Sequence, residues 1–191
     1  AFQDLLDLRT AVIEQVGRSD IVDVFPRLVS MAEANLNRNL RTTDQITATV
    51  LTVASGSVAL PVNFLEVIGV YSPAGLEHVA TTLQNAKGGS PSYAIKGGYI
   101  EAPKISGDIT LQYYASIPTI STGMDASNWL LQKYPAAYLY AVAFEAAKWS
   151  RDRDLASDMG GLMRTEIDDI RAEDERNRYS RSRVRVQGVT P

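Results

Sequence analysis

Six carboxylate residues near the C-terminus form the group with the clearest chemical potential. They are Glu166, Asp168, Asp169, Glu173, Asp174 and Glu175. Carboxylate oxygens bind divalent cations, and paired carboxylates act as general acid and base. However, Arg171 stands four residues before Glu175, and Asp174 stands four before Arg178. Opposite charges at this spacing pair along an exposed helix. We therefore interpret the group as a solvated helix face and predict no catalytic residue and no metal ligand.

The sequence contains few candidate residues for other kinds of enzyme site. The chain has no cysteine and one histidine, His78, which excludes a thiolate nucleophile and cysteine-ligated metals. No GxSxG motif occurs, and we interpret His78 as a surface or interface residue. The run Gly88-Gly89-Ser90 leads into Pro91 and a predicted strand, whereas a phosphate-binding loop leads into a helix. We predict a protein that is not an enzyme and binds no cofactor.

Aromatic residues are concentrated in the second half of the chain. Stacking on nucleic-acid bases would need basic residues between the rings, and only Lys133 and Lys148 are close in sequence. We predict that the aromatic residues belong mainly to the core, with some at subunit contacts, where tyrosine and tryptophan are favoured. The residues chosen for this role are Trp129, Tyr134, Tyr138 and Trp149.

The charge reverses after Glu175, where arginines follow with no further acidic residue. In an extended chain Val184 and Val186 would face one side and the neighbouring arginines the other. Exposed ion pairs contribute only about 0 to 1 kcal/mol each, whereas ordering a flexible segment costs about 2 to 5 kcal/mol. Pairing with the edge strand of a partner would supply the difference. We predict a partner-binding tail that uses Arg176, Arg178, Tyr179, Arg181, Arg183, Val184, Arg185 and Val186; a disordered basic tail remains the alternative.

Helical periodicity appears at both ends of the chain. Apolar residues from Leu5 to Val16 recur at helical spacing and precede Gly17, a typical C-cap. A second helix, with Asp20 or Asp23 as its cap, is expected to end near Asn39. Two further helices are expected to begin at Pro135 and near Arg153.

Between these helices the sequence is rich in threonine and β-branched residues, which is typical of strands. Ser55-Gly56 and Gly97-Gly98 are expected turns, and 81–86 a short helical turn. We predict that strands 46–53, 58–60 and 64–71 form an antiparallel meander, and that a hairpin of 93–96 and 99–101 and a further strand, 109–116, follow.

The sequence thus predicts a mainly helical α+β protein. Its expected parts are N-terminal helices (1–44), an inserted antiparallel β subdomain (45–120), C-terminal helices that complete a bundle (121–175) and an extended tail (176–191). A chain of 191 residues, 45% of them hydrophobic, is long enough to bury a core. No apolar run reaches the roughly 20 residues that span a membrane, so we expect no membrane association. The net charge of −3 argues against nucleic-acid binding over the whole surface.

Several blocks, in this order, resemble the head-to-tail connector adaptor proteins of tailed bacteriophages. The likeness extends from about Asp20 to Arg178. The blocks are Asp23 to Leu28, Ala32 to Arg38, Leu60 to Val67, Tyr93 to Ile100, and Asn128 to Leu131 with Tyr134-Pro135, Tyr138 to Tyr140 and Glu145 to Ala147.

This resemblance implies a structural virion protein made in the host cytoplasm. Such a subunit joins neighbouring copies in a ring of twelve beneath the portal protein, with a tail or nozzle protein below. Genomic DNA passes through the axial channel without sequence-specific binding, and the C-terminal tail docks on the portal.

Two alternatives come from other classes of protein. The first is a DNA-binding module that uses the arginine-rich tail, for which binding to duplex DNA would depend steeply on salt. The second is an enzyme that uses the carboxylates between Glu166 and Glu175, which predicts stabilisation by a divalent metal.

Overall fold

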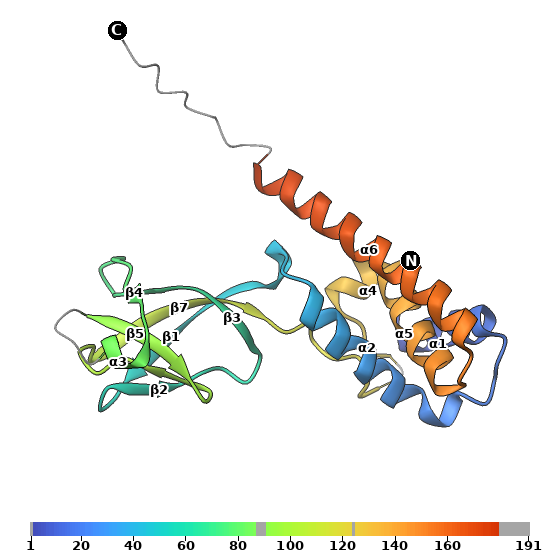
Figure 1. Cartoon of the computed structure of the whole chain (residues 1–191), viewed down its shortest axis with the longest axis horizontal. Helices are drawn as coiled ribbons and strands as arrows, with labels where there is room; N and C mark the ends of the chain where they lie inside the picture. The colour runs from blue at the N-terminus through green and yellow to red at the C-terminus, as the bar shows by residue number, and fades with distance from the viewer. Residues whose placement is uncertain (1, 87–90, 124, 180–191) are drawn as a thin grey trace, which may run out of the picture. The chain divides into compact units, whose positions relative to one another are not determined.

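A computed structural model describes residues 2–86, 91–123 and 125–179 (Figure 1). It confirms the α+β class, with helices and mainly antiparallel sheets. The chain divides into two compact units, which we call the helical unit (1–44 and 117–191) and the β unit (45–116). Each is described separately below.

The helical unit begins with α1 (Leu5–Val16). Asp4 caps its N-terminus by accepting a hydrogen bond from the backbone of Asp7 (3.0 Å). Gly17 ends it in the left-handed conformation (φ 68°), and its N–H donates to Ile13 O. The predicted helix and its glycine cap are thus confirmed.

A 3₁₀ turn, η1 (Val22–Val24), leads directly into α2 (Phe25–Asn39), which has Pro26 in its first turn. The expected cap by Asp20 or Asp23 is wrong: Val24 occupies the capping position, and α2 has no side-chain capping hydrogen bond within the described residues. The preceding 3₁₀ turn already continues the helical path, and Asp20 instead accepts a hydrogen bond from Nε of Arg18 (2.9 Å).

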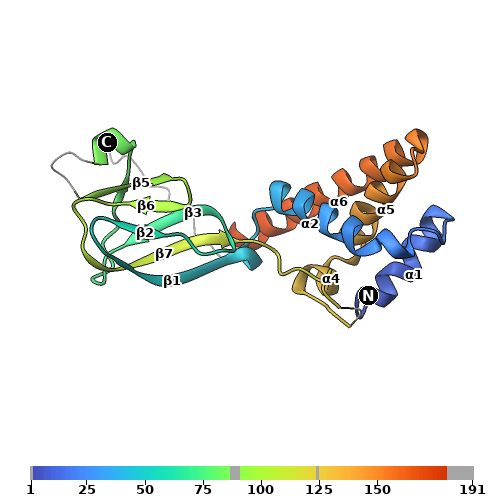
Figure 2. The ribbon, with the colours of Figure 1, turned by 90° about the horizontal axis from the view of Figure 1, so that it is seen from below.

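Three helices complete this unit: α4 (Trp129–Lys133), α5 (Pro135–Trp149) and α6 (Arg153–Tyr179). α5 packs against α1, α2, α4 and α6, and the long α6 runs beside it (Figures 1 and 2). Alanines on α5 (Ala137, Ala141, Ala146) are fully buried and permit close packing. Leu8, Phe25, Leu36, Leu131, Tyr138 and Ile167 are among the residues of the shared core.

α6 extends further than the sequence predicted. The tail was expected to begin at Arg176, but the last turn of α6 includes Arg176, Arg178 and Tyr179. The expectation of extended backbone is therefore wrong for these three residues. Pairing of Arg178 with Asp174, one turn earlier, keeps this end helical. The remaining tail residues, Arg181, Arg183, Val184, Arg185 and Val186, lie outside the described part of the chain.

The β unit contains two sheets. The first has the order β1 (Ile46–Val53), β7 (Gly107–Ala115), β3 (Phe64–Tyr71), and both pairs are antiparallel. The second has the order β2 (Ser57–Ala59), β6 (Tyr99–Glu101), β5 (Ser92–Lys96), β4 (Val79–Ala80). The short helix α3 (Leu83–Ala86) belongs to the β unit, and the 3₁₀ turn η2 (Thr43–Gln45) lies at the boundary between the two units in the sequence.

The strand positions agree closely with the prediction, but the expected meander is wrong. β7, the last strand, lies between β1 and β3, and β4 pairs with β5 in parallel. Ile109, Leu111 and Tyr113 of β7 are buried, so the strand with the most buried residues takes the centre of the first sheet. Periodicity indicates which face of a strand is buried but not which strand is its neighbour.

Both predicted turns have the backbone that their glycines allow. Gly97 and Gly98 have φ of 57° and 84° and join β5 to β6 with Lys96 opposite Tyr99. Two successive positive φ values fit the twist of a tight hairpin. At the other turn, a Cβ on Gly56 (φ 80°) would lie 2.9 Å from Cα of Pro103.

Candidate assembly site

The C-terminal end of α2 is capped by arginines from two parts of the chain. Arg41 Nη1 donates to Asn37 O (2.7 Å) and Leu40 O, and Arg171 of α6 donates to Asn39 O. A helix ends with unsatisfied carbonyl groups and a partial negative charge, which cations stabilise. Both arginines are thus engaged within the chain.

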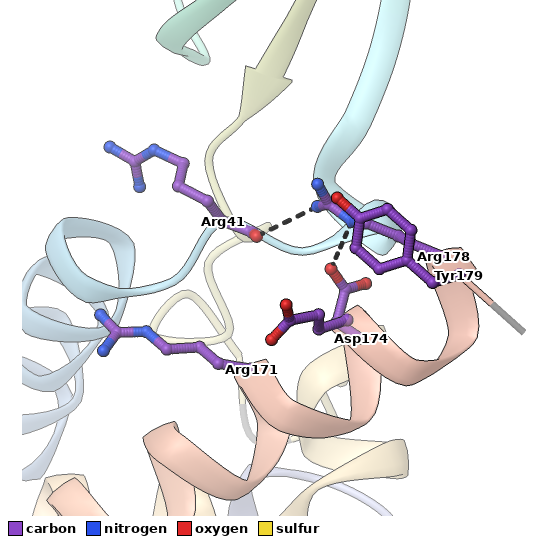
Figure 3. A pocket seen from close by; sticks show the side chains of 6 residues that line it. Arg41, Arg171, Asp174, Arg178 and Tyr179 are labelled. Atoms are coloured by element: carbon purple, nitrogen blue, oxygen red, sulfur yellow. Dashed lines mark hydrogen bonds and ion pairs between the residues drawn. The ribbon is translucent and has the colours of Figure 1, made fainter. Parts of the chain in front are cut away.

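Arg178 and Asp174 hold the segment that follows α2 (Figure 3). Arg178 Nη2 donates to Arg41 O (3.3 Å), and its Nε lies 2.7 Å from Oδ2 of Asp174. Asp174 Oδ1 accepts hydrogen bonds from the backbone N–H (2.8 Å) and the hydroxyl (2.6 Å) of Thr43. The last turns of α6 therefore fix residues 39–43, through which the chain leaves the helical unit.

Asp174 is ionised in this setting. Burial of its carboxyl favours the neutral form, but the hydrogen bonds from Thr43 and the charge of Arg178 outweigh this effect and lower its pKa below the ordinary value. The predicted pair of Asp174 and Arg178 is confirmed. The interpretation of Asp174 as part of a solvated face is wrong, because this residue is buried. Arg171 forms its ion pair with Asp168 (3.2 Å).

A pocket of about 260 Å³ opens at this place (Figure 3). Tyr179, at the end of α6, is 65% exposed. The residues that line the pocket are Arg41, Arg171, Asp174, Glu175, Arg178 and Tyr179. It is a charged surface at the point from which residues 180–191 continue.

The chain returns to the helical unit at Ile117, where α2 holds it again. Asn37 Oδ1 accepts a hydrogen bond from the backbone N–H of Ile117 (2.8 Å). The buried carboxylate of Glu33 accepts from the backbone N–H of Ile120 (2.8 Å) and the hydroxyl of Thr119 (2.7 Å). α2 therefore contributes to fixing both places where the β unit is inserted.

Tyr138 and Asn128 complete the bonding of Glu33. The hydroxyl of Tyr138 donates to Glu33 (3.2 Å) and accepts from Nδ2 of Asn128 (2.7 Å). Asn128 also donates to Pro118 O (2.6 Å) and caps α4 by accepting from the N–H of Leu131 (2.9 Å). Burial and, to a lesser extent, the Glu33 carboxylate raise the pKa of Tyr138. Each polar group of this network has a structural partner, so the arrangement orders the chain.

The four aromatic residues chosen from the sequence take different positions. Tyr138 is fully buried, and Trp129 and Tyr134 are half-buried against the same core. Trp149, at the end of α5, is 37% exposed, and the guanidinium of Arg18 lies 5.7 Å from its ring centroid. His78 is half-buried in the β unit, where its backbone N–H donates to Val70 O (2.8 Å).

Sequence reasoning missed Glu33, Asn37 and the burial of Asp174. Glu33 carried a usable signal, because it lies four residues after Val29 and three before Leu36 on the apolar stripe of α2. A charged residue at such a position requires buried partners. Asp174 likewise continues the series Met163, Ile167 and Ile170.

Within residues 2–86, 91–123 and 125–179, no three histidine, cysteine or acidic side chains are grouped so as to hold a metal ion. No helix in these ranges is long and apolar enough to cross a membrane.

The family model described as SU10 adaptor protein matches residues 3–187. The chain belongs to this family and is a structural adaptor protein of a bacteriophage. A search of curated proteins found no match. The DNA-binding alternative gains no support from these findings.

Proposed function

We propose that this adaptor forms a ring beneath the portal protein and joins the portal to the tail or nozzle protein, as part of the virion connector. The ring contains twelve copies and continues the DNA channel. The C-terminal residues of each copy dock on the portal through the tail predicted from Arg181 to Val186. The proposal rests on the family match together with the position from which the tail starts.

The single structural observation that carries the docking proposal is the anchoring of the end of α6. Asp174 and Arg178 bind residues 41–43, so the last helical turn is held on the body of the helical unit. A segment that starts from a fixed point loses less entropy when it binds than one attached to a mobile end. Exposed Tyr179 and Arg176 extend the docking surface onto the helix itself.

Repetition around the ring supplies the strength of attachment. Each tail gains only a modest free energy from its ion pairs and valine contacts. When one copy is bound, the tails of the others are held at high effective concentration, so the assembled ring binds far more tightly than a single subunit. The net negative charge of the chain fits a channel that lets DNA slide, because such a channel must not bind phosphates strongly.

The test is binding to the purified portal ring of the same virus, measured by co-sedimentation. The chain should be shortened after Tyr179, because a cut at Glu175 would also remove Arg178 from Asp174 and disturb the fold. We expect the full chain to bind and the chain ending at Tyr179 to lose binding. Equal binding by both chains would exclude the tail as the docking segment.

Two tail variants separate charge from strand pairing. Replacing Arg181, Arg183 and Arg185 with serine removes the charges and keeps the valines. Replacing Val184 and Val186 with serine removes the valine side chains and keeps the charges. If the tail adds a strand to the portal, the valine variant loses binding even at low salt, whereas the arginine variant loses mainly the dependence on salt.

A further inference from the structure

A groove lies between α2 and α5 on the helical unit. Two pockets of about 360 and 270 Å³ adjoin there, and both are lined by Met31, Glu145 and Lys148. Met31 is 46% exposed, although its side chain is long and apolar, and Trp149 at the end of the groove is 37% exposed. The groove therefore presents apolar surface that the described chain leaves uncovered.

The rim of this groove is positively charged. Arg27, Met31, Ala34 and Arg38 follow one another at spacings of four, three and four residues, so they form one exposed stripe along α2. Glu145, the acidic residue of both pockets, is already paired with Lys148 (2.8 Å). In the described part of the chain Arg27 and Arg38 have no ion-pair partner.

α6 carries a stripe of opposite charge. Asp158, Leu162 and Asp169 are exposed on one side of this helix, and Leu162 is 42% exposed despite being apolar. Glu166 and Glu173 are half-buried beside them. Asp158 and Asp169 have no ion-pair partner among residues 2–86, 91–123 and 125–179.

The two stripes have the same spacing. Met31 follows Arg27 by four residues and Leu162 follows Asp158 by four; Arg38 and Asp169 each follow seven residues later. Both stripes therefore span about 16 Å along their helices. When the helices lie parallel, Arg27 meets Asp158, Met31 meets Leu162, and Arg38 meets Asp169. An antiparallel arrangement places Leu162 near Ala34 and loses the contact between the two long apolar side chains.

A chain cannot make this contact with itself. Gly160, Arg164 and Arg171 of α6 line a pocket of about 380 Å³ together with Asn35 and Asn39 of α2, so they face α2. The acidic stripe lies two residues before these positions: Asp158 precedes Gly160, Leu162 precedes Arg164, and Asp169 precedes Arg171. Two residues are about half a helical turn, so the stripe lies on the opposite side of α6.

We propose that the α2–α5 groove of one copy binds the Asp158–Leu162–Asp169 stripe of a second copy of this chain. The contact joins two different surfaces, so each copy uses its groove on one neighbour and its stripe on the other, and repetition gives a ring when the rotation between neighbours closes. This inference deepens the proposed ring function and rests on it. The apolar contact of Leu162 with Met31 and Trp149 provides affinity, and the arginine–aspartate pairs fix the register.

Cysteine cross-linking tests the contact directly, because the chain contains no cysteine of its own. Met31→Cys and Leu162→Cys chains are mixed and oxidised, alone and on the portal ring. We expect a disulfide between the two variants, and about tenfold less when Ala34→Cys replaces Met31→Cys. Preferred cross-linking through Ala34, or no cross-link with or without the portal, would overturn the proposal.

Charge reversal provides a second test. Variant G carries Arg27→Glu and Arg38→Glu, and variant S carries Asp158→Arg and Asp169→Arg. Alone, each brings like charges together, and we expect self-association at least about tenfold weaker than for the natural chain, measured by sedimentation. Mixed, G and S restore opposite charges at each contact and should assemble in alternation. A mixture that associates no better than either variant would contradict the proposal.

The same experiments separate this inference from the proposed function. If natural chains bind the portal but Met31→Cys and Leu162→Cys do not cross-link, the interface is wrong and the adaptor role stands. If they cross-link but no assembly binds the portal, the interface stands and the adaptor role fails.

If Arg27→Glu with Arg38→Glu abolishes binding of duplex DNA and leaves self-association unchanged, the groove binds nucleic acid and the proposal is overturned. A cross-link that forms only after removal of residues 180–191 would make the tail the occupant of the groove in the full chain and would also overturn the proposal.

Discussion

Asp174 of α6 accepts two hydrogen bonds from Thr43, a residue 131 positions earlier in the chain, at 2.8 Å from the backbone N–H and 2.6 Å from the hydroxyl. The same carboxylate pairs with Arg178 (2.7 Å). The end of α6 is therefore tied to the segment through which the chain leaves the helical unit. A perturbation at the start of the tail reaches this segment through one buried side chain.

Replacing Asp174 with alanine should destabilise the helical unit by about 1.5 to 3 kcal/mol. The change removes a charged acceptor and leaves two donors of Thr43 without it. Urea unfolding, followed by circular dichroism, measures the loss. Glu175→Ala is the matched control, because this neighbour is exposed, and should change stability by less than about 0.5 kcal/mol. Equal effects of the two substitutions would argue against the role of Asp174.

The contribution of Asp174 should disappear in acid. Its pKa in the folded chain is lower than the ordinary value of 3.8, so its stabilisation is complete above that value and is lost as the pH falls through the folded pKa. The difference in unfolding free energy between the natural chain and Asp174→Asn should therefore shrink between pH 6 and pH 3. A difference that stays constant over this range would mean that ionisation of Asp174 does not contribute.

Glu33→Ala should cost about 3 kcal/mol, because the buried donors of Ile120 and Tyr138, and the hydroxyl of exposed Thr119, lose their acceptor. Tyr138→Phe removes one donor to Glu33 and should cost less, about 1 to 2 kcal/mol. Glu14→Ala on the exposed side of α1 serves as the control. If Tyr138→Phe proves more damaging than Glu33→Ala, the hydroxyl rather than the carboxylate is the centre of the network.

These residues show how far the sequence leads. The helix ending at Gly17 and the hairpin at Gly97-Gly98 follow from local chemistry, and both were predicted correctly. The position of β7 between β1 and β3 depends on long-range pairing, which local patterns do not encode. The helical state of Arg178 depends on Asp174, whose burial in turn depends on Thr43. The candidate site was therefore predictable in composition but not in geometry.

Two adjacent glycines of α6 should respond oppositely to alanine. Gly161 is exposed with open space around it, so Gly161→Ala should stabilise the chain by about 0.5 to 1 kcal/mol. At Gly160 a Cβ would lie 3.1 Å from Cε2 of Phe144, so crowding between α5 and α6 offsets that gain. Thermal unfolding of the two variants compares them directly. Equal stabilisation would show that α5 and α6 are not in close contact at Gly160.

The adaptor role itself is tested most directly by the number of copies on the portal. Native mass spectrometry of the full chain, mixed in excess with the portal ring of its virus, gives this number. The proposed function predicts one complex with twelve copies, which the chain ending at Tyr179 does not form. Absence of any complex at low and at moderate salt, or a broad distribution of copy numbers, would contradict it.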